Sequence, residues 1–332
     1  MTTRVSSAAM QEHDSGSRMR QTAALVVLAV LASGCSAQRI VSNRLASALA
    51  AGGDTYASDN DPELVAAALP FSLKLMESVL ASTPEHRGLL AATSAAFTQY
   101  AYAFVQQEAD LAALEDVERA WAGQDRARRL YLRARDYGLR GLDSVHPGFS
   151  DELRRTPAVA ASRAGAAEVD LLYWTAVAWA AAITLGKDDP ALVADLPVVS
   201  ALIDRAEAVD GDWGQGAIHT FQISYGMARP DAPEDRLGAV RAHFDQAVTL
   251  SGGHDVGPHL GWAEAVCLPR EDRDCFEESL RRALALDADA YPPTRLANRV
   301  QQRRAAWLLA NVDHWILPPL ADDAGIDGEP TR

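Results

Sequence analysis

The sequence predicts an all-α fold in which antiparallel helix pairs stack into an array. Of its 332 residues, 48% are hydrophobic, alanine is abundant, and no run of alternating β-branched residues is long enough to indicate a strand. An apolar stripe of helical period, at positions i, i+4 and i+7, also returns in four segments. The stripes are Ala127, Tyr131 and Ala134; Val199, Ile203 and Ala206; Val240, Phe244 and Ala247; and Phe276, Leu280 and Ala283.

The spacing of the stripes indicates a tetratricopeptide-like helical repeat. The alanines at 206, 247 and 283 stand 41 and 36 residues apart, and Ala134 precedes Ala206 by 72 residues, or two periods of 36. Tetratricopeptide repeats, which stack helix pairs, have a period of about 34 residues. Unrelated amphipathic helices can share such a stripe by chance, but its recurrence in four segments favours a helical-repeat scaffold.

Composition and motifs argue against several classes of function. The formal net charge of −14 disfavours a nucleic-acid partner, because a phosphate backbone binds a clustered basic face. The sequence contains no Gly-rich phosphate loop, Gly-x-Ser-x-Gly elbow or His-Glu-x-x-His zinc motif. His243, His254 and His259 lie within 17 residues, but no Cys, Asp or Glu joins them at a tight metal-ligand spacing. We therefore predict no catalytic residue, no metal site and no cofactor.

Residues 1–34 are predicted to be a lipoprotein signal peptide. Arg18 and Arg20 precede an apolar stretch that ends in Leu-Ala-Ser-Gly before Cys35, which resembles a bacterial lipobox. That resemblance implies that Cys35 is lipidated and becomes the mature N-terminus. A short transmembrane anchor is the alternative, but about 11 apolar residues are too few to span a bilayer. Ser36, in place of an aspartate, resembles a signal for sorting to the outer membrane.

The remainder of the chain divides into three parts. Residues 35–61 are expected to hold the lipid anchor, a first short helix from Ile40 to Ala50 and a linker. Residues 62–317 are the tetratricopeptide-like helical domain, and the Gly/Asp/Pro-rich residues 318–332 are expected to be a disordered tail. Within the domain, periodicity predicts helices over residues 64–80 with a bend or break at Pro70, 85–105, 126–145, 171–186, 197–209, 214–227, 234–250, 256–266, 273–286 and 294–315.

Five arginines gather at the start of the helix predicted for residues 126–145. They are Arg126, Arg128, Arg129, Arg133 and Arg135. The run is interpreted as a solvated face whose charges pair with nearby acids, and a binding role is the alternative.

The uncharged stretch from Leu171 to Gly186 is expected to form the central helix, buried on most sides. It is short for a membrane span. Trp174 and Trp179 differ by five positions, about 140° on a helix, so one of them could face a cavity. The candidate ligand-binding side chains of an aromatic-lined cavity are Tyr173, Trp174, Trp179, Phe221, Tyr225 and Trp262. The alternative is that all six are ordinary core residues.

Cys267 and Cys275 flank a short predicted turn between two helices. In an exported chain this placement favours a disulfide that closes a small loop, and free thiols are the alternative. Metal binding would need two further ligands, and only acids lie near the pair in the sequence.

Several stretches resemble the T-component (TatT) lipoproteins of tripartite ATP-independent periplasmic (TRAP) transporters. They are Thr83 to Leu90, Phe97 to Phe104, Ala127 to Gly138, Leu172 to Trp174, Trp179, Lys187 to Pro190, and Arg295 to Asn298. The similarity runs from about Ile40 to Trp315, which is nearly all of the expected mature chain. The cysteine pair is not part of the family pattern, so the predicted disulfide depends on spacing alone.

The resemblance implies a tetratricopeptide-like fold without enzymatic activity, a homotrimer, and a channel or cleft near the protein centre. It also implies association with the periplasmic solute-binding P component of the transporter, and help in delivering organic or hydrophobic solutes. Two alternatives stay open. One is a general envelope lipoprotein scaffold for protein–protein assembly, because helical repeats form concave binding surfaces for many partners. The other is an enzyme whose motifs escape sequence inspection.

Overall fold

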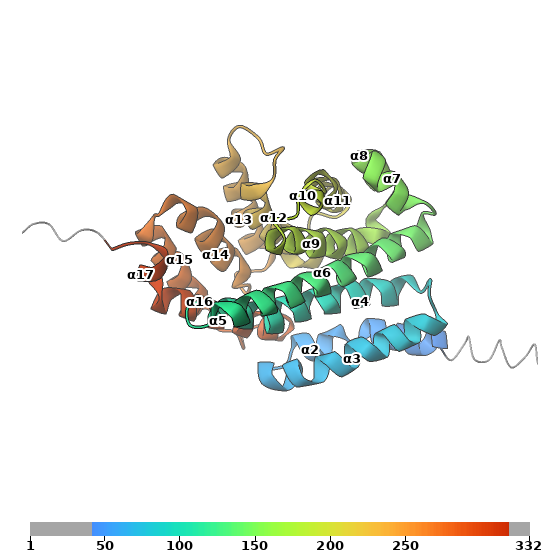
Figure 1. Cartoon of the computed structure of the whole chain (residues 1–332), viewed down its shortest axis with the longest axis horizontal. Coiled ribbons are helices and arrows are strands. Elements are labelled where there is room, and N and C mark those ends of the chain that lie inside the picture. The colour runs from blue at the N-terminus through green and yellow to red at the C-terminus, as the bar shows by residue number, and fades with distance from the viewer. Residues whose placement is uncertain (1–41, 319–332) are drawn as a thin grey trace, which may run out of the picture.

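The structure, a computed structural model, describes residues 42–318, and these residues form helices without any strand (Figure 1). The predicted all-α fold is therefore confirmed. The alanine that ends each of the four apolar stripes is buried, as the stripe pattern requires. The repeat arrangement itself stays a prediction. The signal peptide, Cys35 and nearly all of the expected tail lie outside the described residues.

The helices follow one another through short connections. From a helical stretch at 42–51 to the central helix they are α2 (Gly53–Ala57), α3 (Pro62–Ser82), α4 (Arg87–Tyr100), α5 (Gln107–Ala112), α6 (Val117–Val145), α7 (Phe149–Arg155), α8 (Pro157–Ser162) and α9 (Val169–Leu185). The later helices are α10 (Pro190–Val193), α11 (Leu196–Val209), α12 (Trp213–Ala228), α13 (Arg236–Leu250), α14 (Gly257–Trp262), α15 (Arg273–Ala285), α16 (Arg295–Ala310) and α17 (Val312–Trp315). Two π-helical segments, η1 (Ala101–Gln106) and η3 (Ala263–Cys267), continue α4 and α14.

The helices α6 and α9 occupy the middle of the array (Figure 1). α6 packs against α4 and α9, and α9 packs in turn against α11. Ten residues of α9 are buried, as predicted for the uncharged stretch. A second core lies among α14, α15 and α16, around Phe276 and Leu280. The C-terminal helices therefore have a core of their own beside the main one.

The structure corrects three predictions about the extent of helices. α3 continues through Pro70 as one helix, so the break that was one of the two alternatives there does not occur. α6 begins at Val117 rather than at residue 126, because the Asp116 side chain accepts a hydrogen bond from the Arg119 N–H and caps the helix. The closing helix predicted for 294–315 divides at Asn311 into α16 and α17.

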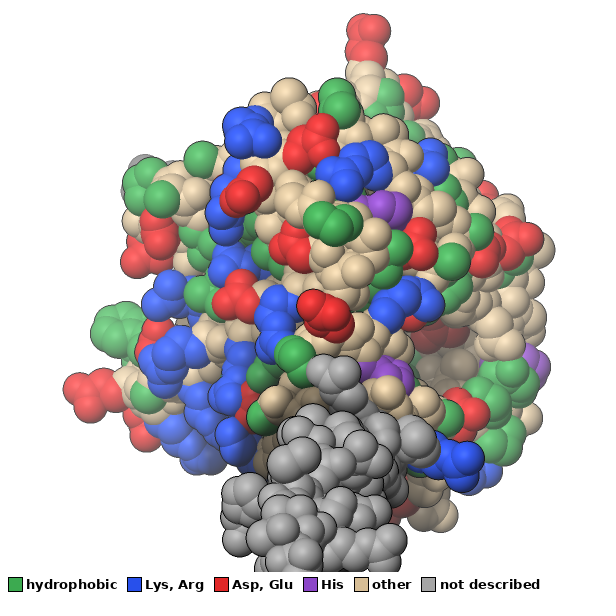
Figure 2. All heavy atoms as spheres, turned by 90° about the vertical axis from the view of Figure 1, so that its right-hand side faces the viewer, with side chains coloured by type: hydrophobic (Ala, Val, Ile, Leu, Met, Phe, Trp, Pro, Cys, Tyr) green, Lys and Arg blue, Asp and Glu red, His purple; other side chains and the backbone are tan. Residues whose placement is uncertain are grey.

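The arginine run of α6 forms ion pairs at the surface. Arg128 and Arg129 pair with Asp125 one turn away, and Arg133 pairs with Glu77 of α3. Figure 2 shows Lys and Arg side chains gathered on one side of the molecule, with Asp and Glu side chains among them. These contacts agree with the interpretation of the run as a solvated, ion-paired face.

Two of the described helices are long and apolar enough to cross a membrane by length and composition. One is Ala166–Leu185, whose apolar window is 61% buried inside the protein, as expected of a core helix. The other is α3, whose window is only 28% buried. The side chains of Leu64 and Phe71 on α3 are 59% and 74% exposed, so this helix presents an apolar face that the described chain leaves uncovered.

Candidate functional site

Aromatic side chains from α9 and α12 form one cluster. The ring centroids of Tyr173 and Trp174 lie 4.9 Å apart, and Trp213 approaches Tyr173 to 4.8 Å. Phe221 lies 6.5 Å from Tyr173 and stacks on Tyr225 at 5.3 Å. The structure thus brings together four of the six predicted aromatic candidates, and Trp213 joins them.

The cluster includes Trp213 because the chain turns sharply after it. Gly214, Gln215 and Gly216 have φ values of 62°, 56° and 93°, which is the left-handed region that glycine adopts easily. The amide of Gln215 donates a hydrogen bond of 2.6 Å to the hydroxyl of Tyr291, which helps to hold this residue in its unusual conformation. The sequence contains the Gly-x-Gly pattern, but the pattern does not reveal which way Trp213 points.

A carboxyl group lies beside the cluster. Asp255 accepts hydrogen bonds from the Gly257 N–H at 2.9 Å and from the Thr220 hydroxyl at 3.4 Å. Burial raises the pKa of the Asp255 carboxyl above its usual range. Burial, together with the nearby charge of Asp255, raises the pKa of Tyr173. The cluster therefore has a carboxyl group beside its aromatic rings, and this group accepts hydrogen bonds from Gly257 and Thr220.

The other two aromatic candidates lie apart from this cluster. Trp179 is 3% exposed, and its indole N–H donates to Asp195 Oδ2 at 3.1 Å. The Arg135 guanidinium lies 4.9 Å from the centroid of its ring. Trp262, on α14, contacts α13 instead, 5.2 Å from the Phe244 ring. The six candidates therefore do not form a single wall, and Trp174 and Trp179 have separate surroundings.

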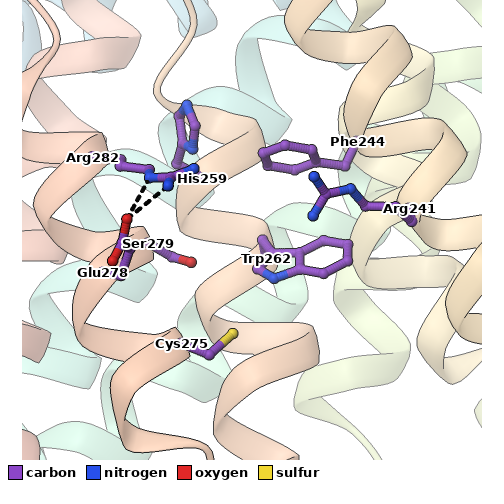
Figure 3. Close-up of a pocket in the computed structure, with 8 residues that line it drawn as sticks. All are labelled: Arg241, Phe244, His259, Trp262, Cys275, Glu278, Ser279 and Arg282. Atoms are coloured by element: carbon purple, nitrogen blue, oxygen red, sulfur yellow. Dashed lines mark hydrogen bonds and ion pairs between the residues drawn. The ribbon is translucent and has the colours of Figure 1, made fainter.

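Trp262 belongs to a surface pocket between α13, α14 and α15 (Figure 3). The pocket has a volume of about 170 Å³. It is lined by Arg241, Phe244, His259, Trp262, Cys275, Glu278, Ser279 and Arg282. A neighbouring hollow of about 410 Å³ shares Arg241 and Trp262 and extends to Leu237. We call these two hollows together the Trp262 groove.

The Trp262 groove combines aromatic faces with cationic groups. The Arg241 guanidinium lies 5.1 Å from the Phe244 centroid and 5.2 Å from that of Trp262, so it contacts both rings, which also contact each other (Figure 3). Arg282 donates to Glu278 Oε1 at 2.6 and 3.0 Å. Arg241 also pairs with Asp245 at 3.2 Å, and both arginine side chains are more than half exposed. This arrangement suits the binding of an organic anion with an apolar body, or of an acidic peptide segment.

The structure joins Cys267 to Cys275 in a disulfide with Cα atoms 5.6 Å apart. Cys267 is completely buried, and Cys275 lines the Trp262 groove. The bond closes the short turn that contains the segment Leu268–Arg270 and fixes the start of α15 against η3. The disulfide therefore connects α15, which forms one wall of the groove, covalently to η3.

Reduction of this disulfide should lower the free energy of unfolding by about 2–3 kcal/mol, because the loop-closure entropy of a loop this short is regained by the unfolded chain. Urea unfolding with and without dithiothreitol measures the effect. The variant Cys275→Ser should match the reduced wild-type chain and should not respond to the reductant. A variant that still responds would show that another bond is being reduced.

Comparison with known proteins shows the family to which the chain belongs. The family described as TRAP transporter T-component matches residues 58–315. The chain belongs to this family. An uncharacterized protein of Treponema pallidum (strain Nichols) is 30% identical over 307 residues, which cover 87% of this chain and 95% of that protein. The resemblance inferred from short stretches is confirmed, and membership in the T-component family connects the chain with a TRAP transporter.

The Trp262 groove contains residues that the sequence analysis did not select. Arg241 and Phe244 are three positions apart on α13, so they share a face, but their pairing with Trp262 depends on how α13 meets α14. His259 and Arg282 were likewise not selected as site residues. Phe244 belongs to a recurrent apolar stripe, which is the one signal that pointed to this position.

Proposed function

We propose that this T-component is a non-enzymatic, periplasm-facing lipoprotein that associates with the solute-binding P component of a TRAP transporter. In this role it assists the uptake of an organic solute. The family match over residues 58–315 is the observation that carries the proposal. The Trp262 groove supports it, since arginine and aromatic groups together suit an acidic and partly apolar ligand.

The experiment that tests this function is direct binding of the two purified proteins. The P component encoded beside the subunits of the same transporter should bind the T-component in isothermal titration calorimetry. Trp262→Ala should weaken that binding at least about tenfold, because truncating an aromatic anchor typically costs more than 1.4 kcal/mol. Trp121→Ala is the matched control, since Trp121 is 67% exposed and does not line the groove.

The possible outcomes test the proposed partner and the proposed contact site separately. Absence of binding between the wild-type proteins would overturn the proposed partner and favour a general envelope scaffold. Equal binding by Trp262→Ala and Trp121→Ala would leave the partner standing and exclude the groove as its contact. The aromatic cluster would then be tested in the same way with Trp174→Ala, because Trp174 is only partly buried.

We further propose that a lipid on Cys35 anchors the protein in the outer membrane. The lipobox-like residues before Cys35 and Ser36 after it support this anchor and its sorting. Several acyl chains together hold a protein stably, because each buried CH₂ group contributes about 0.8 kcal/mol. Metabolic labelling with a radioactive fatty acid should mark the wild-type chain and leave Cys35→Ser unlabelled. Equal labelling of the two chains would rule out this anchor.

The homotrimer implied by the family resemblance is also proposed here. The exposed apolar face of α3, with Leu64 and Phe71, supports an oligomer because a subunit interface would remove this surface from water. Light scattering of the detergent-solubilised chain should give three times the mass of one chain. Phe71→Glu should shift the mass toward the monomer if α3 lies in the interface.

A further inference from the structure

Three side chains of the kind that bind transition metals meet outside the Trp262 groove. Glu207 is near the end of α11, His219 lies on α12, and His243 lies on α13. The Nδ1 atoms of the two histidines are 2.9 Å apart, and His219 Nδ1 is 4.0 Å from Glu207 Oε1. One ligand atom from each residue lies within 4.8 Å of the other two. Three successive helices thus contribute one group each to the same small volume.

These separations are close to those of a metal centre. In a tetrahedral zinc site with metal–nitrogen bonds of about 2.0–2.1 Å, neighbouring ligand atoms lie roughly 3.3 Å apart. Two observed separations, 2.9 and 4.0 Å, lie on either side of that value, and the third, between Glu207 and His243, is within 4.8 Å. Side-chain adjustments of about 1–1.5 Å would therefore place all three groups around one ion.

The surroundings of Glu207 leave one of its carboxylate oxygens facing the histidines. Gln222, which is 1% exposed, donates from Nε2 to Glu207 Oε2 at 3.3 Å. Glu207 Oε1 is the oxygen that faces His219. A hydrogen bond to one carboxylate oxygen that leaves the other for the metal is a common second layer of metal sites.

We propose that Glu207, His219 and His243 bind one divalent metal ion of the zinc class, with a fourth position open to water or to a group from a partner. Two imidazoles and one carboxylate are a ligand set that zinc accepts with an open position. The ion would fasten α11, α12 and α13 together just beyond the sharp turn at Gly214–Gly216. Metal occupancy would thereby stiffen the helices that lead into the Trp262 groove.

The test uses the full chain, purified in detergent without a polyhistidine tag and stripped with a chelator. Titration with Zn²⁺ should show one site per chain, and Co²⁺ should give the visible absorption bands of a tetrahedral site. His243→Ala and Glu207→Gln should each weaken binding by about 100-fold or more, because outer-shell changes alone cost up to about that much. Zn²⁺ should also raise the thermal unfolding midpoint of the wild-type chain and leave that of His243→Ala unchanged.

His314→Ala is the matched control, because His314 is an exposed histidine on α17. It should bind Zn²⁺ as the wild-type chain does. Absence of stoichiometric binding by the wild-type chain would overturn the proposal and leave a plain histidine–histidine hydrogen bond. Equal losses in His243→Ala and His314→Ala would also overturn it, since they would indicate scattered surface binding. Circular dichroism of the metal-free variants shows whether each is folded before it is titrated.

Discussion

Replacement of Arg304 by methionine should lower the free energy of unfolding by about 3–5 kcal/mol, the cost of leaving buried charges without a partner. Arg304, on α16, donates to Asp110 Oδ2 at 2.9 Å and to Glu264 Oε1 at 2.7 and 2.9 Å. The side chains of Arg304 and Asp110 are each only 16% exposed. Methionine preserves much of the volume of arginine but leaves both carboxylates unpaired.

The neighbouring Arg303 provides a matched control. It forms one ion pair, with Glu108 at 2.7 Å, and its side chain is 59% exposed. Arg303→Met should therefore change the free energy of unfolding by no more than about 1 kcal/mol. Urea unfolding followed by circular dichroism measures both variants. Similar small losses in the two variants would show that water reaches Asp110 and Glu264 and screens them.

The Arg304 contacts also show what sequence inspection cannot supply. Arg304 and Asp110 are 194 residues apart in the chain. Helical periodicity predicted α16 and placed an arginine on it, but periodicity describes one helix at a time and gives no information on which helices meet. The π-helical segments η1 and η3 lie near the acids that bind Arg304, and their extra residue per turn leaves no simple period in the sequence.

The same limit explains which residues of the candidate sites could be predicted from the sequence. The burial of the central helix was predictable, because a long uncharged stretch in a helical domain favours burial on most sides. His219 and His243 are 24 residues apart and lie on different helices, so no short metal-ligand spacing in the sequence joins them. Trp213 lies in the aromatic cluster beside a turn with positive φ values, and helical periodicity does not predict such a turn. Local patterns thus predicted the helices, whereas the sites depend on which helices pack against each other.

A methyl group added at Gly138 should destabilise the fold even though alanine favours helices. Gly138 lies where α6 meets α4 and α9. A Cβ there would overlap the Thr175 hydroxyl, lie 3.1 Å from Thr175 Cβ and lie 3.2 Å from Ser94 Oγ. Both neighbours are completely buried and have no room to move aside. We therefore expect Gly138→Ala to cost about 1–3 kcal/mol, the usual range for overpacking.

The control for Gly138→Ala is Gly53→Ala on α2, where a new Cβ would meet nothing within 4 Å. That substitution should be neutral or stabilising by up to about 1 kcal/mol, because alanine has the higher helix propensity. The double variant Gly138→Ala with Thr175→Ala should recover part of the loss, since it removes the overlapping hydroxyl and leaves the 3.1 Å contact. If Gly138→Ala unfolds at the same urea concentration as Gly53→Ala, then α6 and α9 can separate without cost, and the close packing of the central helices does not limit stability.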